Sequence, residues 1–66
     1  MERLNEARAA LAQRGHTAEV FPALPMRWMY GRAVPALWTE APPGDVAEVL
    51  PGALGERRGG GWAYCL

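Results

Sequence analysis

Hydrophobic positions near the N-terminus follow the spacing of a helix. Leu4, Ala7 and Leu11 recur at i, i+3 and i+7, which predicts a helix over Glu2–Arg14 with one narrow apolar stripe. Gly15 then supplies the left-handed conformation in which helices commonly end. Because the stripe consists of small and medium side chains, we expect this helix to pack closely against a sheet.

Several later segments instead alternate with the period of a strand. We expect strands at Thr17–Phe21, Met26–Val34, Ala36–Glu40 (a third strand or the continuation of the second) and Trp62–Leu66. Pro22 and Pro25 are expected to end the first of these strands. Pro35 is expected at a turn or at a sheet edge, because proline cannot donate to a ladder of hydrogen bonds.

A second, shorter helix is predicted after the proline-rich loop. Asp45 is expected to be its N-cap, Val46–Leu50 its body, and Glu48 a capping-box partner. Pro51 is expected to end it. Residues 53–61 are expected to form a loose turn followed by a flexible, glycine-rich joint.

Together these elements predict an α+β fold in one domain, residues 1–66. An N-terminal helix packs on a three- to four-stranded, mainly antiparallel sheet, and a short second helix precedes the last strand. A chain of 66 residues buries only about 60% of the surface that it exposes when unfolded, so tight packing or association must contribute to its stability. This order of elements is common in small bacterial and phage proteins and assigns no functional residues.

Strand alternation predicts a bulky aromatic face on the sheet. It places Trp28 and Tyr30 on one face of the second predicted strand, and Trp62 and Tyr64 on one face of the last. We expect the first helix to cover the opposite, small-residue face, which leaves only the short helix above rings that each bury roughly 150–250 Å². Such a patch is typical of a partner site. Alternatively, the rings form the core and the first helix packs on them.

The leading hypothesis is therefore a non-enzymatic protein-interaction module, either a homodimer or a subunit that docks on a larger protein. Trp, Tyr and Arg are enriched at binding hot spots. The expected contact residues are Trp28, Tyr30, Arg32, Trp38, Trp62 and Tyr64.

Charge argues against a protein that coats nucleic acid or an anionic membrane, because seven acidic residues balance seven basic ones. A nucleic-acid-binding regulator remains an alternative, since arginines alternate with aromatic residues as they do in single-strand binders. Its expected contacts are Arg27, Arg32, Arg57 and Arg58.

The sequence offers little catalytic, metal or cofactor chemistry. It contains no serine, and one cysteine with one histidine cannot form a closed zinc shell. Cys65 has no basic neighbour and is expected to be a buried, unreactive thiol. His16 follows the predicted helix end and is expected to interact with the helix dipole. A third hypothesis makes His16 the base of a small enzyme subunit that another chain completes.

Composition also bears on location and source. There is no long apolar run, and the charged first residues are not followed by the apolar segment of a signal peptide, so a cytoplasmic protein is expected. Every basic residue is arginine, and isoleucine is absent, as in proteins encoded by GC-rich DNA. The scarcity of Asn, Gln and Cys also suits a thermophile.

Overall fold

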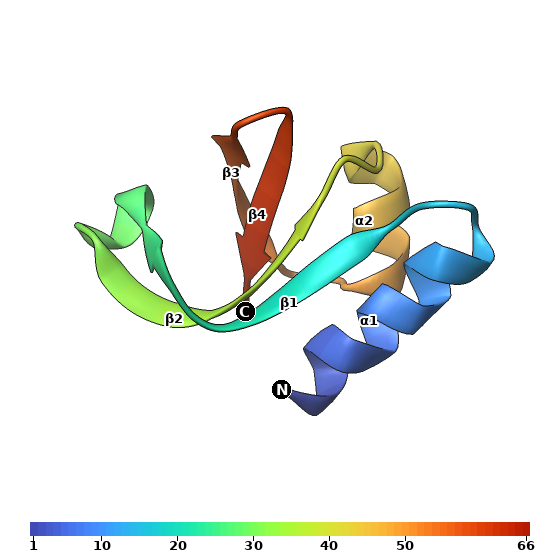
Figure 1. Ribbon diagram of the computed structural model, residues 1–66, viewed down its shortest axis with the longest axis horizontal. Helices are drawn as coiled ribbons and strands as arrows, with labels where there is room; N and C mark the ends of the chain where they lie inside the picture. Colours follow the sequence, from blue (N-terminus) through green and yellow to red (C-terminus); the bar gives the residue numbers. More distant parts are fainter.

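A computed structural model describes all 66 residues as one curled sheet with helices on one side (Figure 1). The elements are α1 (Glu2–Gln13), β1 (Ala18–Met26), the 3-10 helix η1 (Arg27–Met29), β2 (Arg32–Thr39), α2 (Pro43–Val49), β3 (Leu54–Arg58) and β4 (Gly61–Cys65). All neighbouring strands are antiparallel, in the order β1-β2-β4-β3. The predicted α+β class is confirmed. No helix has the length and apolarity that crossing a membrane requires.

Helix α1 ends as its sequence predicts. Gly15 has φ +85°, and its N–H donates to the Ala12 carbonyl at 3.0 Å. The N–H of His16 donates to the Leu11 carbonyl at 2.9 Å, which completes a Schellman motif. The predicted apolar stripe of Leu4, Ala7 and Leu11 is buried.

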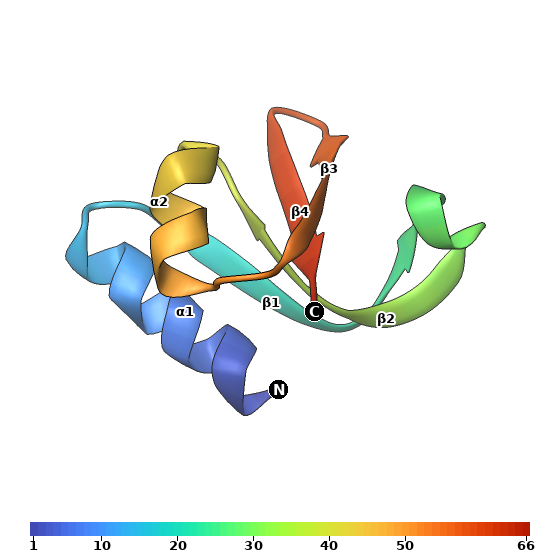
Figure 2. The same ribbon diagram turned by 180° about the vertical axis from the view of Figure 1, so that it is seen from behind.

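Both helices cover the same face of the sheet (Figures 1 and 2), where they form the larger of two cores with Leu37 of β2 and Tyr64 of β4. The expectation that α1 covers the small-residue face is wrong. The opposite face carries Ala63 and Cys65. Neither α1 nor α2 packs on it, and Met29 of η1 does. The reason is volume: α1 and α2 together bring leucine and valine side chains that fill the space around the Tyr64 ring, whereas Ala63 offers little surface to bury.

The second predicted strand, Met26–Val34, is not a strand over its whole length. Met26 ends β1, η1 follows, and Tyr30 and Gly31 turn the chain with φ +57° and +81° before β2 begins at Arg32. Residues 26–34 therefore form the end of a hairpin. The side chains of residues 27–31 therefore do not alternate between two faces of a sheet.

The prolines are accommodated where the ladder does not need their N–H groups. β1 is an edge strand, and its pairing with β2 shifts between Phe21 and Leu24, so it continues past Pro22 and Pro25 instead of ending there. Pro35 lies within β2 outside the stretch that pairs with β4, which comprises residues 37–39. β2 is therefore one continuous strand, and Ala36–Glu40 is its continuation.

The last hairpin replaces the loose turn and flexible joint expected for residues 53–61. β3 pairs with β4 along its whole length, and Gly59 and Gly60 form the tight turn between them. The strand was hard to predict because Leu54–Arg58 reads LGERR, which has neither β-branched residues nor clear alternation. A glycine is needed at position 55, since the ring of Tyr64 lies where a Cβ would be.

Candidate functional site

The tip of the β1–β2 hairpin carries the most exposed aromatic side chains. Tyr30 has a relative exposure of 101%, and Trp28 of 45%. Arg27 and Arg32 flank them and are also exposed. Two rings and two guanidinium groups thus project from one short turn.

This tip is fastened to β3 by two half-buried side chains, Glu56 and Arg58. One carboxylate oxygen of Glu56, Oε1, accepts the backbone N–H of Arg27 at 2.8 Å and of Trp28 at 3.3 Å. These are first-turn N–H groups of η1 that have no partner within the helix. Arg58 adds a second tie, because its Nη1 donates to the Pro25 carbonyl at 2.7 Å.

The backbone at Tyr30 is unusual for a residue other than glycine. It is the one such residue with a positive φ, +57°. The left-handed conformation costs free energy in L-residues, and residues held in it cluster at functional sites. Here it directs the phenol ring into solvent, where no intramolecular contact repays the cost.

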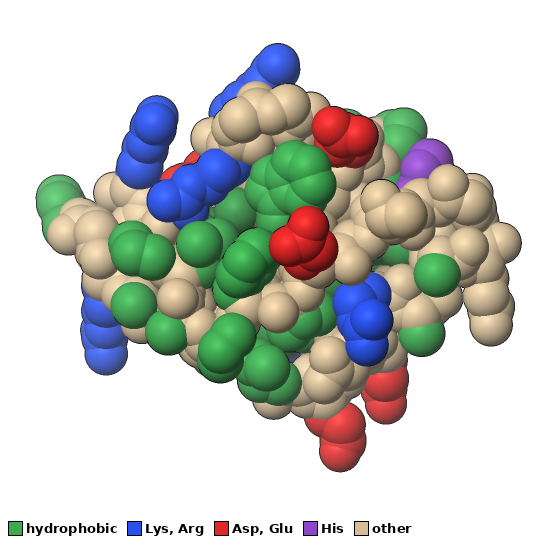
Figure 3. Space-filling view, viewed as in Figure 1, with side chains coloured by type: hydrophobic (Ala, Val, Ile, Leu, Met, Phe, Trp, Pro, Cys, Tyr) green, Lys and Arg blue, Asp and Glu red, His purple; other side chains and the backbone are tan.

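Charge at the tip is positive. Neither Arg27 nor Arg32 forms an ion pair, and Oε1 of Glu56 is engaged by the η1 backbone. Arginine side chains project from the end of the molecule that holds the tip and the β3–β4 turn (Figure 3). The four arginines proposed for nucleic acid are not equally available, however. Arg57 stacks over Trp62 at 5.5 Å from the ring centroid, and Arg58 binds Pro25.

The residues predicted for partner contact do not share one side of the sheet. Tyr64 lies on the helix-covered face with only 6% exposure, and Trp62 is partly buried on that face. Trp38 lies half-buried on the opposite face. Trp28, Tyr30 and Arg32 are at the tip. The expected aromatic sheet face is therefore wrong, because the turn at residues 27–31 removes Trp28 and Tyr30 from the sheet.

A shallow groove lies beside the tip, on the face without helices. Its volume is about 330 Å³, and its lining residues are Glu19, Phe21, Leu24, Trp38 and Arg58. Figure 3 shows hydrophobic side chains across this part of the surface, with acidic and basic side chains next to them. The groove is apolar at its floor and charged at its sides.

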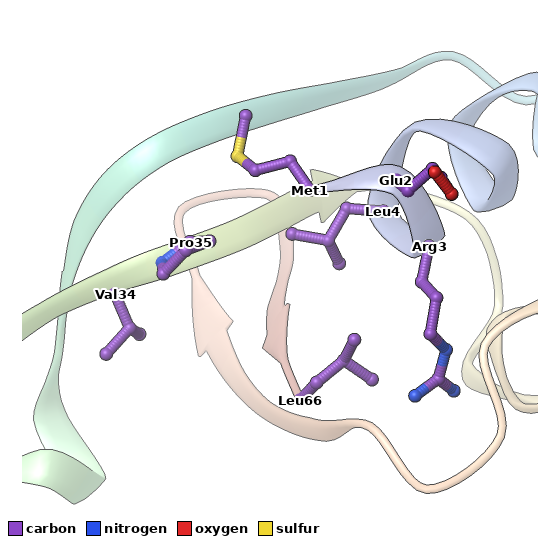
Figure 4. Close-up of a pocket in the computed structure, with 7 residues that line it drawn as sticks. All are labelled: Met1, Glu2, Arg3, Leu4, Val34, Pro35 and Leu66. Carbon is purple, nitrogen blue, oxygen red and sulfur yellow. The ribbon is translucent and has the colours of Figure 1, made fainter.

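A larger cavity of about 430 Å³ lies where the start of α1, the middle of β2 and the end of β4 meet (Figure 4). Leu4 and Leu66 point into the same space, and Glu2 points away from it. Arg3 donates through Nη2 to the Pro51 carbonyl at 3.3 Å. The cavity therefore lacks the convergent polar groups that orient a ligand.

A polar cluster joins the end of α1 to the start of α2. Asp45 is not the N-cap, because α2 begins at Pro43, after Pro42 as the N-cap. Its Oδ2 lies 3.0 Å from Nε2 of His16, and its Oδ1 lies 3.6 Å from Arg14.

The rest of this cluster also departs from the sequence prediction. Glu48 does not form a capping box, and its Oε1 accepts a hydrogen bond from Arg14 at 2.7 Å. No three side chains of His, Cys, Asp or Glu are grouped so that they could hold a metal ion. The cluster links two helices and positions His16 against a carboxylate.

Cys65 lies in the smaller core between the sheet and the tip, with Met26, Ala36 and Ala63. It is a free, buried cysteine, as predicted. Burial raises the pKa of its thiol, so the nucleophilic thiolate is disfavoured near neutral pH.

The sequence alone did not predict the groove, nor the side chains of β3 that hold the tip. Nothing in LGERR marks Glu56 as the anchor of a turn almost thirty positions away, or Arg58 as its second tie. The one local signal was Tyr30-Gly31, a pair that favours a turn over a continuous strand. Comparisons with protein-family models, curated proteins and solved structures give no match to this chain.

Proposed function

We propose that this chain is a non-enzymatic protein-interaction module that contacts its partner through the tip of the β1–β2 hairpin. The observation that carries the proposal is the fully exposed ring of Tyr30, held in a left-handed conformation on a turn that Glu56 fastens to β3. A ring exposed in this way contributes nothing to the fold. It has a large apolar area to bury when a partner covers it.

The chemistry of the tip indicates what kind of partner fits. Trp, Tyr and Arg dominate binding hot spots, and a turn ordered before binding loses less entropy when it binds. Arg27 and Arg32 have no intramolecular ion pair, so they are available for carboxylates of the partner. The proposed partner surface is therefore a protein pocket with apolar walls and an acidic rim.

Site-specific photo-crosslinking in the producing cell tests this proposal. A photoreactive phenylalanine analogue replaces Tyr30 in one strain and the exposed Arg8 of α1 in the control strain. We expect a discrete protein adduct from position 30, absent from position 8 and strongly reduced by Trp28→Ala. Equal labelling from both positions, or adducts that disappear with nuclease treatment, would contradict a protein partner at the tip.

A second candidate, single-stranded nucleic acid, is favoured by the alternation of arginine and rings at the tip. Arg27 and Arg32 would contact phosphates while Trp28 and Tyr30 stack on bases. With only about two phosphate contacts, affinity should fall with salt at a logarithmic slope near −1.4, the value expected for single strands. A titration with a labelled oligonucleotide at two salt concentrations tests it, and no binding at the lower concentration excludes it.

A further inference from the structure

The sheet face opposite the helices is only partly covered by the chain itself. The hairpin tip covers the end around Met26, Ala63 and Cys65, which are buried. Beyond the tip lies the groove, where Phe21 and Leu24 are half-buried and no element lies above them. The uncovered half of this face is an apolar surface that no contact within the chain accounts for.

The floor of the groove is a rigid indole. Nε1 of Trp38 donates to the Arg58 carbonyl at 2.9 Å, which spans β4 and ties the ring to β3. The ring passes directly over Gly61, where an added Cβ would lie 2.8 Å from its Cζ2. Trp38 therefore presents a fixed, flat apolar surface that needs no rearrangement before it is covered.

Opposite charges lie on the two sides of this ring. Glu19 on β1 is the direct cross-strand partner of Trp38, so both side chains are on the same face of the sheet. Arg58 is on β3, at the other side of the ring. Its Nη1 donates to the Pro25 carbonyl and lies 3.7 Å from Oε2 of Glu56, whereas its Nη2 makes no hydrogen bond or ion pair within the chain. Glu19 is exposed and has no ion pair.

We infer that the occupant of this groove is a second copy of the chain, related to the first by a two-fold axis through the two Trp38 rings. The axis exchanges the two sides of the groove, so Glu19 of each copy faces Arg58 of the other. This is the self-complementary arrangement that a symmetric interface requires. Phe21 and Leu24 of both copies would lie beside the axis, where the interface would bury them.

Charge also argues against other occupants. A strongly acidic partner would meet Glu19, and a strongly basic one would meet Arg58. The chain itself carries seven charges of each sign, so two copies approach without net repulsion. The inference goes beyond the proposed function, because it uses a surface that excludes Tyr30 and can therefore fail independently of it.

Sedimentation velocity over a range of concentrations tests the inference. We expect the wild-type chain to show a monomer–dimer equilibrium that weakens with salt. Glu19→Arg places like charges opposite Arg58, and we expect it to raise the dimer dissociation constant by at least about tenfold. Glu6→Arg, the same charge change on the exposed face of α1, should leave the constant unchanged.

Two further variants complete the test. Glu19→Gln should weaken the dimer less than Glu19→Arg. It replaces Glu19→Arg in the test if the Glu19→Arg protein does not fold. Tyr30→Ala should leave the dimer intact, which separates this surface from the tip. A wild-type chain that stays monomeric at its highest soluble concentration overturns the inference. So does a dimer that is insensitive to Glu19→Arg, one that Tyr30→Ala dissolves, or association that requires added nucleic acid.

Discussion

At the scale of single residues, large rings on this sheet are accommodated by glycines on the adjacent strands. The ring of Tyr64 fills the space above Gly55, and an added Cβ there would lie 2.6 Å from its Cε1. On its other side the ring lies in the core that includes Val46 and Leu50, beside a hollow of about 210 Å³ that α2 and Tyr64 line. A glycine in a strand is normally unfavourable, but here it is the residue that allows the core to close.

Gly55→Ala is therefore expected to lower the free energy of unfolding by about 1–3 kcal/mol, as overpacked cores do. Urea unfolding measures the change. Gly44→Ala is the matched control, because a Cβ at Gly44 meets no atom within 4 Å and its backbone is helical. Equal stability of the two variants would show that the ring of Tyr64 can move aside.

Tyr64 also predicts a loss of stability in alkaline solution. Burial raises the pKa of its phenol above the ordinary value of 10.0. Above that value the unfolded chain releases the proton and the folded chain keeps it, so the stability present below pH 10 declines as pH rises. Cys65 adds to the decline, because burial raises the pKa of its thiol as well, from 9.0.

Tyr64→Phe should make this decline shallower and should not destabilise the protein at pH 7. The hydroxyl of Tyr64 is buried without a hydrogen-bond partner, so its removal eliminates a desolvation cost of about 1–3 kcal/mol. Urea unfolding at pH 7 and above pH 10 measures both effects, with Tyr30→Phe as the exposed control. A large loss of stability at pH 7 would show that the hydroxyl has an unrecognised partner.

At the scale of elements, α1 is held to the sheet by its buried stripe. Leu11 has 0% exposure, and its carbonyl also receives the N–H of His16 at the end of the helix. Leu11→Ala should lower the free energy of unfolding by about 2–5 kcal/mol, because it removes buried methyl groups and leaves a cavity. Leu54→Ala is the control, since Leu54 is 52% exposed. A similar loss in both variants would contradict the packing of α1.

The hairpin tip is held to β3 in part by one distant carboxylate, that of Glu56. Glu56→Ala removes the acceptor of two N–H groups, and hydrogen bonds to a charged group are worth about 1.5–3 kcal/mol. We expect amide hydrogen exchange at Arg27 and Trp28 to accelerate by about tenfold or more, since each tenfold corresponds to about 1.4 kcal/mol. Glu56→Gln keeps one acceptor oxygen and should give a smaller change. Unchanged exchange in Glu56→Ala would mean that the tip is ordered by packing alone.

At the scale of the whole molecule, one sheet separates two small cores. Neighbouring residues of β2 and β4 contribute to both, Leu37 and Tyr64 to the helix side and Ala36 and Ala63 to the tip side. Because the same backbone supports both faces, neither core can be lost while the other persists. The protein should therefore unfold as one cooperative unit.

Two probes that report opposite faces test this expectation. Far-ultraviolet circular dichroism follows α1 and α2. In a Trp62→Phe background, which removes the one tryptophan on the helix-covered face, fluorescence follows Trp28 at the tip and Trp38 on the opposite face. The two denaturation midpoints should coincide in this background, with and without Leu11→Ala. Separate midpoints would show that the tip side unfolds independently.

The sequence by itself determined the elements whose signals are local. The spacing of Leu4, Ala7 and Leu11 with Gly15 after them specified α1, and the apolar alternation from Trp62 specified β4, because helix period, strand period and helix end depend only on near neighbours along the chain. It also singled out Trp28, Tyr30 and Arg32, although it placed them on a strand.

Only the tertiary structure decided which face the helices cover, that LGERR forms β3, and that Glu56 and Arg58 fasten the tip. These outcomes depend on contacts between residues far apart in the chain, where side-chain volume and unpaired backbone groups select the partner. The alternation around Tyr30 predicted a strand, but residues 27–31 form η1 and a turn, and Glu56 of β3 accepts two of their backbone N–H groups. The groove beside Trp38 arose in the same way, as the part of the sheet that the hairpin tip and the helices leave uncovered.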